Sequence, residues 1–318
     1  MNTDGSGWTA TKRTTTPFSK SYPQFQVNNG KIYLIWSEAD GTHNQIWTAV
    51  MNIDGTGWSA VKRTSTAADK ETPQLQVVNN SIHFVWGESD GFNSQIWTAV
   101  MNTDGTGWSA NQRTSAVTPK LTPQFHVVEN KIHYVWSEYL GGHFQVITAT
   151  MNTDGTKWAG TQRTFTSRDK MFPQLQASEE KIYYVWREND GSHLQVRVSW
   201  MNVDGSGWYS PGLSESPYDK THPQFQVVNN RVYCVLSQDD GSYDQIWTVT
   251  LDLSQTDLRA DAIKRTSSEF SKGYPQMQVF NRKIYYIWCE NDGSNIQIWT
   301  AVSSNFAPGA VDLLLLDD

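Results

Sequence analysis

The stretch Met51-Asn52-Ile53-Asp54-Gly55 decides the fold, because it recurs every 50 residues along the chain. Copies that keep the Asn and the Asp-Gly pair begin at Met1, Met101, Met151 and Met201. A Pro-Gln pair follows the same period, at Pro23, Pro73, Pro123, Pro173, Pro223 and, after a slip of two residues, Pro275. Six copies account for nearly the whole chain. A residue that appears six times is therefore either architecture or part of a site that is built six times.

Each repeat shows the pattern of four short strands separated by turns. The first alternates polar and apolar residues, as a strand does. The second is β-branched, aromatic and apolar on both faces, which is typical of a strand covered on both sides. Asp-Gly pairs mark tight turns before the third strand and before the fourth. In the first full repeat the four strands are expected at Gln24–Val27, Lys31–Glu38, Gln45–Met51 and Trp58–Thr64.

Four antiparallel strands per unit, with a period near 50 residues, predict an all-β fold, a six-bladed β-propeller. A parallel β-helix would need shorter coils, and helical solenoids would need a period of about 3.6 residues. The final repeat supplies only three strands. The N-terminal stretch 8–15 matches a fourth strand, so we expect it to complete the last blade and close the ring. The blades are expected at 23–65, 73–115, 123–165, 173–215, 223–266 and 275–302 plus 8–15, in one domain over 1–302, with a C-terminal tail at 303–318.

Bulk properties exclude several classes of partner. The net charge of the 318-residue chain is -7 and its pI is near 5.5, which gives no electrostatic footprint for nucleic acid. Its apolar runs, including Leu313–Leu316, are shorter than the ~20 residues that span a bilayer. No signal peptide is visible, so we expect a protein that is cytoplasmic or exported without a cleaved signal. Cys234 and Cys289 lie in apolar strands and are expected to be small buried hydrophobic residues.

Recurring polar residues gather on one rim of the predicted propeller. Glu and Gln side chains accept and donate hydrogen bonds there, Lys donates, and a Trp two residues after the Gln points the same way. A hydroxyl-rich ligand needs such fixed polar groups beside an apolar platform. The set is most complete in the first, second and sixth repeats. The predicted ligand-binding residues are Lys20, Glu38, Asp40, Gln45, Trp47, Lys70, Glu88, Asp90, Gln95, Trp97, Lys272, Glu290, Asp292, Gln297 and Trp299.

A structural alternative exists for the same set, since Glu38 and Lys20 can pair across a blade rim and Gln24 can satisfy backbone groups. The Trp residues of the second strand, such as Trp36, are expected in the core. Arginine mostly occupies one repeated position in the fourth strand. Three extra arginines, Arg168, Arg187 and Arg197, all fall in one repeat. The sequence has no Gly-rich phosphate loop and no nucleophile elbow, so we predict no catalytic residue, metal or cofactor.

The turn Asn52–Trp58 resembles the Asp-box of bacterial-neuraminidase repeats, although Asn replaces Ser and Asp54 lies one residue closer to Trp58. The resemblance implies that Asp4, Asp54, Asp104, Asp154 and Asp204 cap their own turns, with calcium binding as an alternative. The layout also resembles multivalent propeller lectins, including the six-bladed fucose-binding kind. We therefore expect a multivalent, non-enzymatic lectin whose partners are glycans. The alternatives are a protein-interaction scaffold and a sialidase-like glycoside hydrolase, which would need a non-repeated arginine cluster, a Tyr nucleophile with a Glu partner and an Asp acid.

Overall fold

The computed structural model describes residues 10–89, 93–178, 180–211, 216–253, 260–280, 283–291 and 293–303. The predicted C-terminal tail lies outside these ranges, apart from Ser303. Within them every regular element is a β-strand, and no helix is long and apolar enough to cross a membrane. The chain divides into two compact units, 1–123 and 124–318, which are described separately.

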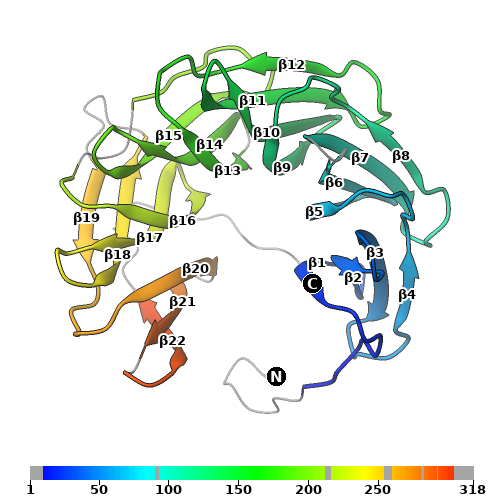
Figure 1. Cartoon of the computed structure of the whole chain (residues 1–318), viewed down its shortest axis with the longest axis horizontal. Helices are drawn as coiled ribbons and strands as arrows, with labels where there is room; N and C mark the ends of the chain where they lie inside the picture. Colours follow the sequence, from blue (N-terminus) through cyan, green and yellow to red (C-terminus); the bar gives the residue numbers. More distant parts are fainter. Residues whose placement is uncertain are drawn as a thin grey trace. The chain divides into compact units, whose positions relative to one another are not determined.

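The fold is the predicted all-β, six-bladed β-propeller, and each blade is one antiparallel sheet whose strands follow in chain order (Figure 1). Blade 1 contains β1 (Lys20–Asn28), β2 (Lys31–Ala39), β3 (Asn44–Asn52) and β4 (Ser59–Lys62), and blade 2 contains β5 (Lys70–Val78), β6 (Ser81–Ser89), β7 (Ser94–Asn102) and β8 (Ser109–Gln112). Blade 3 contains β9 (Lys120–Val128), β10 (Lys131–Leu140), β11 (His143–Asn152) and β12 (Ala159–Gln162), and blade 4 contains β13 (Lys170–Ser178), β14 (Lys181–Asn189) and β15 (Leu194–Asn202). Blade 5 contains β16 (Lys220–Val228), β17 (Arg231–Asp239), β18 (Asp244–Asp252) and β19 (Ala260–Lys264), and blade 6 contains β20 (Lys272–Phe280), β21 (Lys283–Asn291) and β22 (Ile296–Ser303).

Two blades depart from the four-strand pattern in the described part of the chain. In blade 4 the fourth strand shrinks to one bridge between Trp200 and Tyr209, next to Pro211, which lacks the N–H that a ladder needs. In blade 6 three strands are described, and β22 forms an edge. Ile298 of β22 is 72% exposed, whereas its counterpart Ile46 in blade 1 is 0% exposed. This edge therefore exposes side chains that the other blades bury.

The predicted closing strand at 8–15 lies partly outside the described residues, and its described part, from residue 10, carries no strand. Arg13 nevertheless makes the contacts of a fourth-strand arginine. Its guanidinium donates to the carbonyl oxygen of Gly55 at 2.9 Å and lies over the Trp58 ring. Arg63 makes the equivalent contacts with blade 2. Within the first unit, the segment thus lies against blade 1 as the end of a preceding blade would.

The first strands of blades 1, 2, 4, 5 and 6 contain a β-bulge, and the same backbone strain recurs in blade 3. In blade 1, Ser21 pairs with Ser37 and Gln24 with Ile35, so two residues of β1 face one of β2. The residue before each Pro has positive φ, which L-residues seldom adopt. These residues are Tyr22, Thr72, Thr122, Phe172, His222 and Tyr274, with φ between 49° and 56°. The bulge presents one side chain per blade at the same end of the first strand.

The core lies between neighbouring blades within each unit. Second-strand tryptophans fill it, as predicted from the repeat, and Trp86 and Trp186 are 0% and 1% exposed. In the first unit Trp86 packs with Ile35 and Ile46 of blade 1. Cys234 is buried in the corresponding core of the second unit, and Cys289 is half-buried. Both cysteines are free, and the expected burial holds for Cys234 but only in part for Cys289.

Candidate functional site

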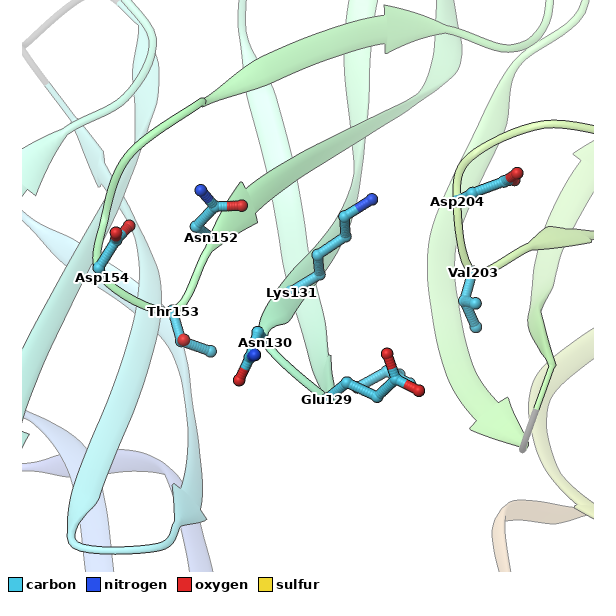
Figure 2. Close-up of a pocket in the computed structure, with 9 residues that line it drawn as sticks. Glu129, Asn130, Lys131, Asn152, Thr153, Asp154, Val203 and Asp204 are labelled. Carbon is cyan, nitrogen blue, oxygen red and sulfur yellow. The ribbon is translucent and has the colours of Figure 1, made fainter.

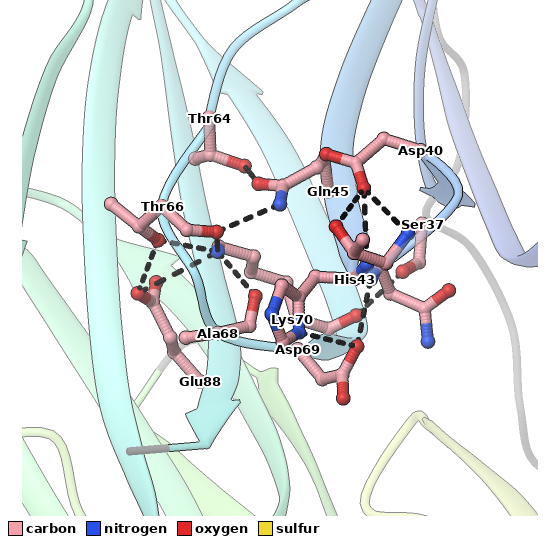
Figure 3. A network of polar contacts seen from close by, with 12 residues as sticks. Ser37, Asp40, His43, Gln45, Thr64, Thr66, Ala68, Asp69, Lys70 and Glu88 are labelled. Atoms are coloured by element: carbon pink, nitrogen blue, oxygen red, sulfur yellow. Dashed lines mark hydrogen bonds and ion pairs between the residues drawn. The ribbon is translucent and has the colours of Figure 1, made fainter. Parts of the chain in front are cut away.

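The predicted rim residues form a buried polar network that recurs from blade to blade (Figure 3). Lys70 is 0% exposed, and its ammonium group donates to the carbonyl oxygens of Thr66 at 3.2 Å and Ala68 at 2.5 Å. Lys70 Nζ lies 3.7 Å from Oε1 of Glu88. Glu88 also accepts hydrogen bonds from the Thr66 hydroxyl at 2.9 Å and from the Trp86 indole at 3.1 Å. All these groups satisfy one another inside blade 2.

The predicted glutamines are part of the same network. Gln45 is 1% exposed, and its Nε2 donates to the carbonyl oxygen of Thr66 at 2.9 Å. Its Oε1 accepts a hydrogen bond from the Thr64 hydroxyl at 2.9 Å. Gln95 makes the equivalent bonds with Ala116 and Thr114. The glutamine therefore ties the third strand of one blade to the segment that leads into the next.

Other members of the predicted set vary in exposure. Lys20 lies 3.6 Å from the buried Glu38, and Lys272 lies 3.4 Å from Glu290. Trp47 stacks on Trp36 and Trp97 stacks on Trp86, with ring centroids 6.1 and 6.2 Å apart. By contrast, Gln297 and Trp299 of β22 are exposed, because no fourth strand is described beside them. The set is thus buried in blades 1 and 2 and partly exposed in blade 6.

Asp40 lies beside these residues and caps the turn between β2 and β3 (Figure 3). Its Oδ1 accepts hydrogen bonds from the backbone N–H groups of Thr42 and His43, and its Oδ2 accepts one from Lys62 at 2.9 Å. These bonds hold the pKa of the Asp40 carboxyl well below its usual range. Asp90 and Asp292 lie outside the described residues. Buried polar groups need internal hydrogen bonds, and this network supplies them, so it has a structural role. Ligand binding by the predicted residues stays a prediction.

A pocket of about 500 Å³ lies at the other end of the strands, between blades 3 and 4 (Figure 2). It is lined by Val128, Glu129, Asn130, Lys131, Asn152, Thr153, Asp154, Val203 and Asp204. Asp154 and Asp204 accept hydrogen bonds from Thr156 and Ser206 within their own turns, as Asp54 and Asp104 do in the first unit. These four aspartates cap their turns as expected, and Asp4 lies outside the described residues. Among the described residues no group of three His, Cys, Asp or Glu side chains is arranged to hold a metal ion.

A second cluster in the 124–318 unit contains residues that do not recur. His222 and Tyr274 occupy the bulge positions of blades 5 and 6, and their ring centroids lie 4.3 Å apart. Phe172 occupies the bulge of blade 4, and the guanidinium of Arg187 lies 4.8 Å from its ring centroid. At the position of Arg187 the other blades carry Ser37, Gly87, Ser137, Ser237 and Cys289. Positive charge, an imidazole and a phenol are therefore gathered at one end of three successive blades.

The electrostatics of this cluster connect its members. The side chains around His222 desolvate its imidazole and lower its pKa. The positive charge of Arg187 lowers it further, whereas the carboxylate of Asp244 raises it. For Asp244, burial raises the pKa, the nearby Asp239 carboxylate adds to this rise, and His222 opposes it. The surroundings of His222 therefore favour its neutral imidazole, and those of Asp244 favour its protonated carboxyl.

Sequence reasoning identified Arg187 as extra but did not connect it with His222, Tyr274 and Asp244. The sequence did contain a signal for these residues, because they differ from the residues at the same positions of other repeats. His222 stands where two other blades carry Thr72 and Thr122, and Asp244 stands where blades 1 and 2 carry Asn44 and Ser94. His222 and Tyr274 both stand at the bulge before Pro in neighbouring blades, where their rings are in contact.

No family model and no curated protein matches the sequence. Similar solved structures include the Trypanosoma rangeli sialidase in complex with sialic acid, with TM-score 0.52 and 11% identity over 90% of this chain and 54% of that one. An ulvan lyase of a polysaccharide lyase family matches with TM-score 0.65 and 11% identity, over 91% and 82% of the two chains. Phage phi92 endosialidase matches with TM-score 0.58 and 12% identity, over 95% and 71%. This chain spans about half the length of the Trypanosoma sialidase, and at these identities the likeness establishes the fold.

These neighbours are all carbohydrate-active enzymes, and they contradict the predicted lectin and the prediction that the chain is not an enzyme. The sialidase-like alternative agrees with them better. The lectin prediction depended on the recurrence of Lys, Glu and Gln on one rim. Recurrence of this kind also follows from burial, because every blade needs the same internal hydrogen bonds to close its edge against the next.

Proposed function

We propose that this chain is a carbohydrate-active enzyme that cleaves an anionic polysaccharide at the cluster of Arg187, His222 and Tyr274. The observation that carries the proposal is the contact of His222 with Tyr274, 4.3 Å between ring centroids, beside the non-repeated Arg187. A neutral imidazole, a phenol and a guanidinium are the groups that proton abstraction next to a carboxylate requires. The cluster lies on the exposed end of the first strands, where a long polymer has access.

The chemistry assigns each residue one role. Arg187 pairs with the substrate carboxylate, and the loss of that negative charge acidifies the hydrogen on the adjacent carbon. His222 takes this proton. The electron pair forms a carbon–carbon double bond as the neighbouring bond to the glycosidic oxygen breaks. Tyr274 gives its hydroxyl proton to the leaving oxygen, so the products are a chain with a free hydroxyl and an unsaturated sugar. Phe172, under the guanidinium, offers an apolar face to the sugar ring.

A glycoside hydrolase is the second candidate, and Asp244 favours it. Burial and the Asp239 carboxylate raise the pKa of Asp244, which is the property of a general acid that protonates a glycosidic oxygen. Hydrolysis gives a reducing end without a double bond. The two reactions are therefore told apart by their products.

The test is incubation of the whole chain with uronate-containing and sialic-acid-containing polysaccharides, followed by ultraviolet absorbance of unsaturated products and by reducing-end counts. The elimination proposal expects both signals with uronate polymers. The substitutions His222→Thr and Arg187→Ser place residues that other blades carry at these positions, so the fold is expected to persist. Loss of the base is expected to lower the rate about 10²–10⁴-fold.

Lys131→Gln, at the opposite end of the strands, is the matched control and should keep the parent rate. Reducing ends without absorbance, lost in Asp244→Asn and kept in His222→Thr, would establish the hydrolase instead. A parent protein that cleaves none of the anionic polymers would refute the proposal.

A further inference from the structure

The imidazole ring of His222 makes two contacts inside the 124–318 unit. Its Nδ1 lies 3.1 Å from the hydroxyl oxygen of Thr221, which is hydrogen-bond distance. Its ring centroid lies 4.3 Å from that of Tyr274, and the two ring planes are inclined by 49°. The Nε2 atom makes no hydrogen bond with any residue that the structure describes. One nitrogen of the ring is therefore engaged, and the other is free to meet a substrate.

Thr221 and His222 meet at an irregular step of β16. Successive side chains of a regular strand point to opposite faces, which keeps neighbours apart. Here the register shifts after Thr221, and His222 has a φ of 49°, in the left-handed region. Thr221 itself pairs with Ser237 of β17, so the sheet holds its backbone, and branching at Cβ restricts its side chain. The hydroxyl is thus a well-placed group beside the imidazole.

The strand does not need a hydroxyl at this position. The corresponding residues of the other blades are Ser21, Glu71, Leu121, Met171 and Gly273. Charged, apolar and small side chains all occur there, and each of these first strands still forms. Packing of the strand therefore leaves the residue at this position open, and the hydroxyl of Thr221 is available for the chemistry of the neighbouring imidazole.

The hydrogen bond at Nδ1 decides what Nε2 can do. A neutral imidazole carries one N–H and one lone pair, on different nitrogens. When Nδ1–H donates to the hydroxyl oxygen of Thr221, Nε2 keeps the lone pair and can take a proton. When the hydroxyl donates to Nδ1 instead, Nε2 carries the hydrogen and cannot act as a base. After proton transfer both nitrogens carry hydrogen, and the hydroxyl oxygen still serves as the acceptor at Nδ1.

We infer that Thr221 is a positioning residue that holds the Nδ1–H tautomer of His222 and so presents Nε2 as the proton acceptor of the cluster. Arg187 and Asp244 act on the same imidazole through their charges, whereas Thr221 is its hydrogen-bond partner in the described part of the chain. The catalytic meaning of this inference rests on the proposed function, which makes His222 the base. The tautomer itself belongs to the resting protein, so it can be measured without a substrate.

The tautomer is tested on the whole chain by nitrogen NMR of labelled histidine, at a pH where the imidazole of His222 is neutral. His222→Thr identifies the signals, because they disappear in that variant. Thr221→Val removes the hydroxyl and keeps the shape of the side chain, and Leu121 and Met171 show that an apolar residue is accepted there. Thr221→Ser keeps the hydroxyl and is the matched control, since blade 1 carries Ser21.

We expect Nδ1–H in the parent and in Thr221→Ser. In Thr221→Val we expect a shift toward Nε2–H, the tautomer that a free histidine side chain prefers. On a polymer that the parent cleaves, kcat of Thr221→Val should fall about two- to tenfold, the worth of one hydrogen bond, and Thr221→Ser should restore it. KM should stay unchanged, because the hydroxyl contacts the imidazole and not the sugar.

A tautomer shift in Thr221→Val that is absent in Thr221→Ser supports the inference, even where the parent cleaves no polysaccharide and the proposed function fails. Nε2–H in the parent overturns it, and so does the same tautomer in the parent and in Thr221→Val. Where the parent is active, a Thr221→Val variant that keeps the parent kcat overturns the positioning role as well.

Discussion

The buried Lys70–Glu88 pair gives the sharpest test of the repeated network. We expect Glu88→Ala to destabilise the fold strongly. Lys70 is 0% exposed, and removal of Glu88 leaves its ammonium group without a carboxylate at 3.7 Å. The Thr66 hydroxyl and the Trp86 indole lose their acceptor as well. Breaking a buried ion pair by removing one partner costs about 3–5 kcal/mol.

The size of this loss fixes the expected thermal shift. An unfolding entropy of about 2.1 cal/mol/K per residue gives ~0.7 kcal/mol/K for a chain of this length, so the melting temperature should fall by ~4–8 °C in a cooperative transition. The assay is thermal and urea unfolding followed by tryptophan fluorescence. Burial lowers the pKa of Lys70, whereas Glu88 raises it. Without Glu88 the folded-state pKa falls further below the unfolded value, so the variant should regain stability as the pH rises toward the unfolded pKa of lysine.

Blade 5 supplies the natural control for this substitution. Gln238 replaces the glutamate there, and the buried Lys220 donates to Oε1 of Gln195 at 2.5 Å instead. Glu88→Gln should therefore be milder than Glu88→Ala, because Lys70 can turn to Gln45 in the same way. An alanine variant that melts within about 1 °C of the parent would contradict the assignment of the pair to the folded core.

Three further predictions follow from the exposed edge, the buried histidine and the cysteines. Deleting residues 1–15 should lower the melting temperature and promote aggregation measured by light scattering. The deletion removes the contacts of Arg13 with blade 1 and the segment predicted to cover the β22 edge. A truncated chain as stable and monomeric as the parent would contradict the prediction that this segment completes the last blade. His133 is 0% exposed and burial lowers its pKa to about 4, so stability present above the unfolded pKa of 6.5 should be lost as the pH falls from 6.5 toward 4, by up to about 3 kcal/mol. The substitution His133→Tyr, which places the residue found at Tyr183, should reduce this dependence in urea titrations, while His83 and His126, whose pKa values burial also lowers, keep the remainder. Burial raises the pKa of the Cys234 thiol to about 12, so alkylation under native conditions should modify Cys289 first, as mass spectrometry can show. Preferential labelling of Cys234 would contradict its place in the core.

The fold could be predicted because its information is local and repeated. The 50-residue period fixed the number of blades, and the alternation of apolar residues placed the strands close to their observed bounds. The aromatic second strands identified Trp86 and Trp186 as core residues. Failures of the pattern are equally local, since the weak fourth strand of blade 4 lies beside Pro211.

The site could not be predicted in the same way, because burial of a charged residue is a tertiary property. Lys70 and Glu88 have the sequence signature of a solvated rim, yet the segment leading into blade 2 covers them. The bulge at His222 has no sequence marker except the following Pro. His222 has a positive φ there, and its imidazole contacts Tyr274, a residue 52 positions later, so no pattern within one repeat contains that contact.

A repeated chain carries its own controls, and this changes how its unusual residues are interpreted. Side chains present in most blades, such as Lys70 and Gln45, make equivalent contacts in several copies, so packing explains them without a ligand. Packing does not explain Arg168, Arg187, Arg197 or His222, because the same backbone elsewhere in the chain folds with Ala, Ser, Trp or Thr at those positions. All four are polar or charged and lie at one end of blades 4 and 5. Since each has a replacement already proven in a neighbouring blade, substitution tests their chemistry with the least disturbance of the fold.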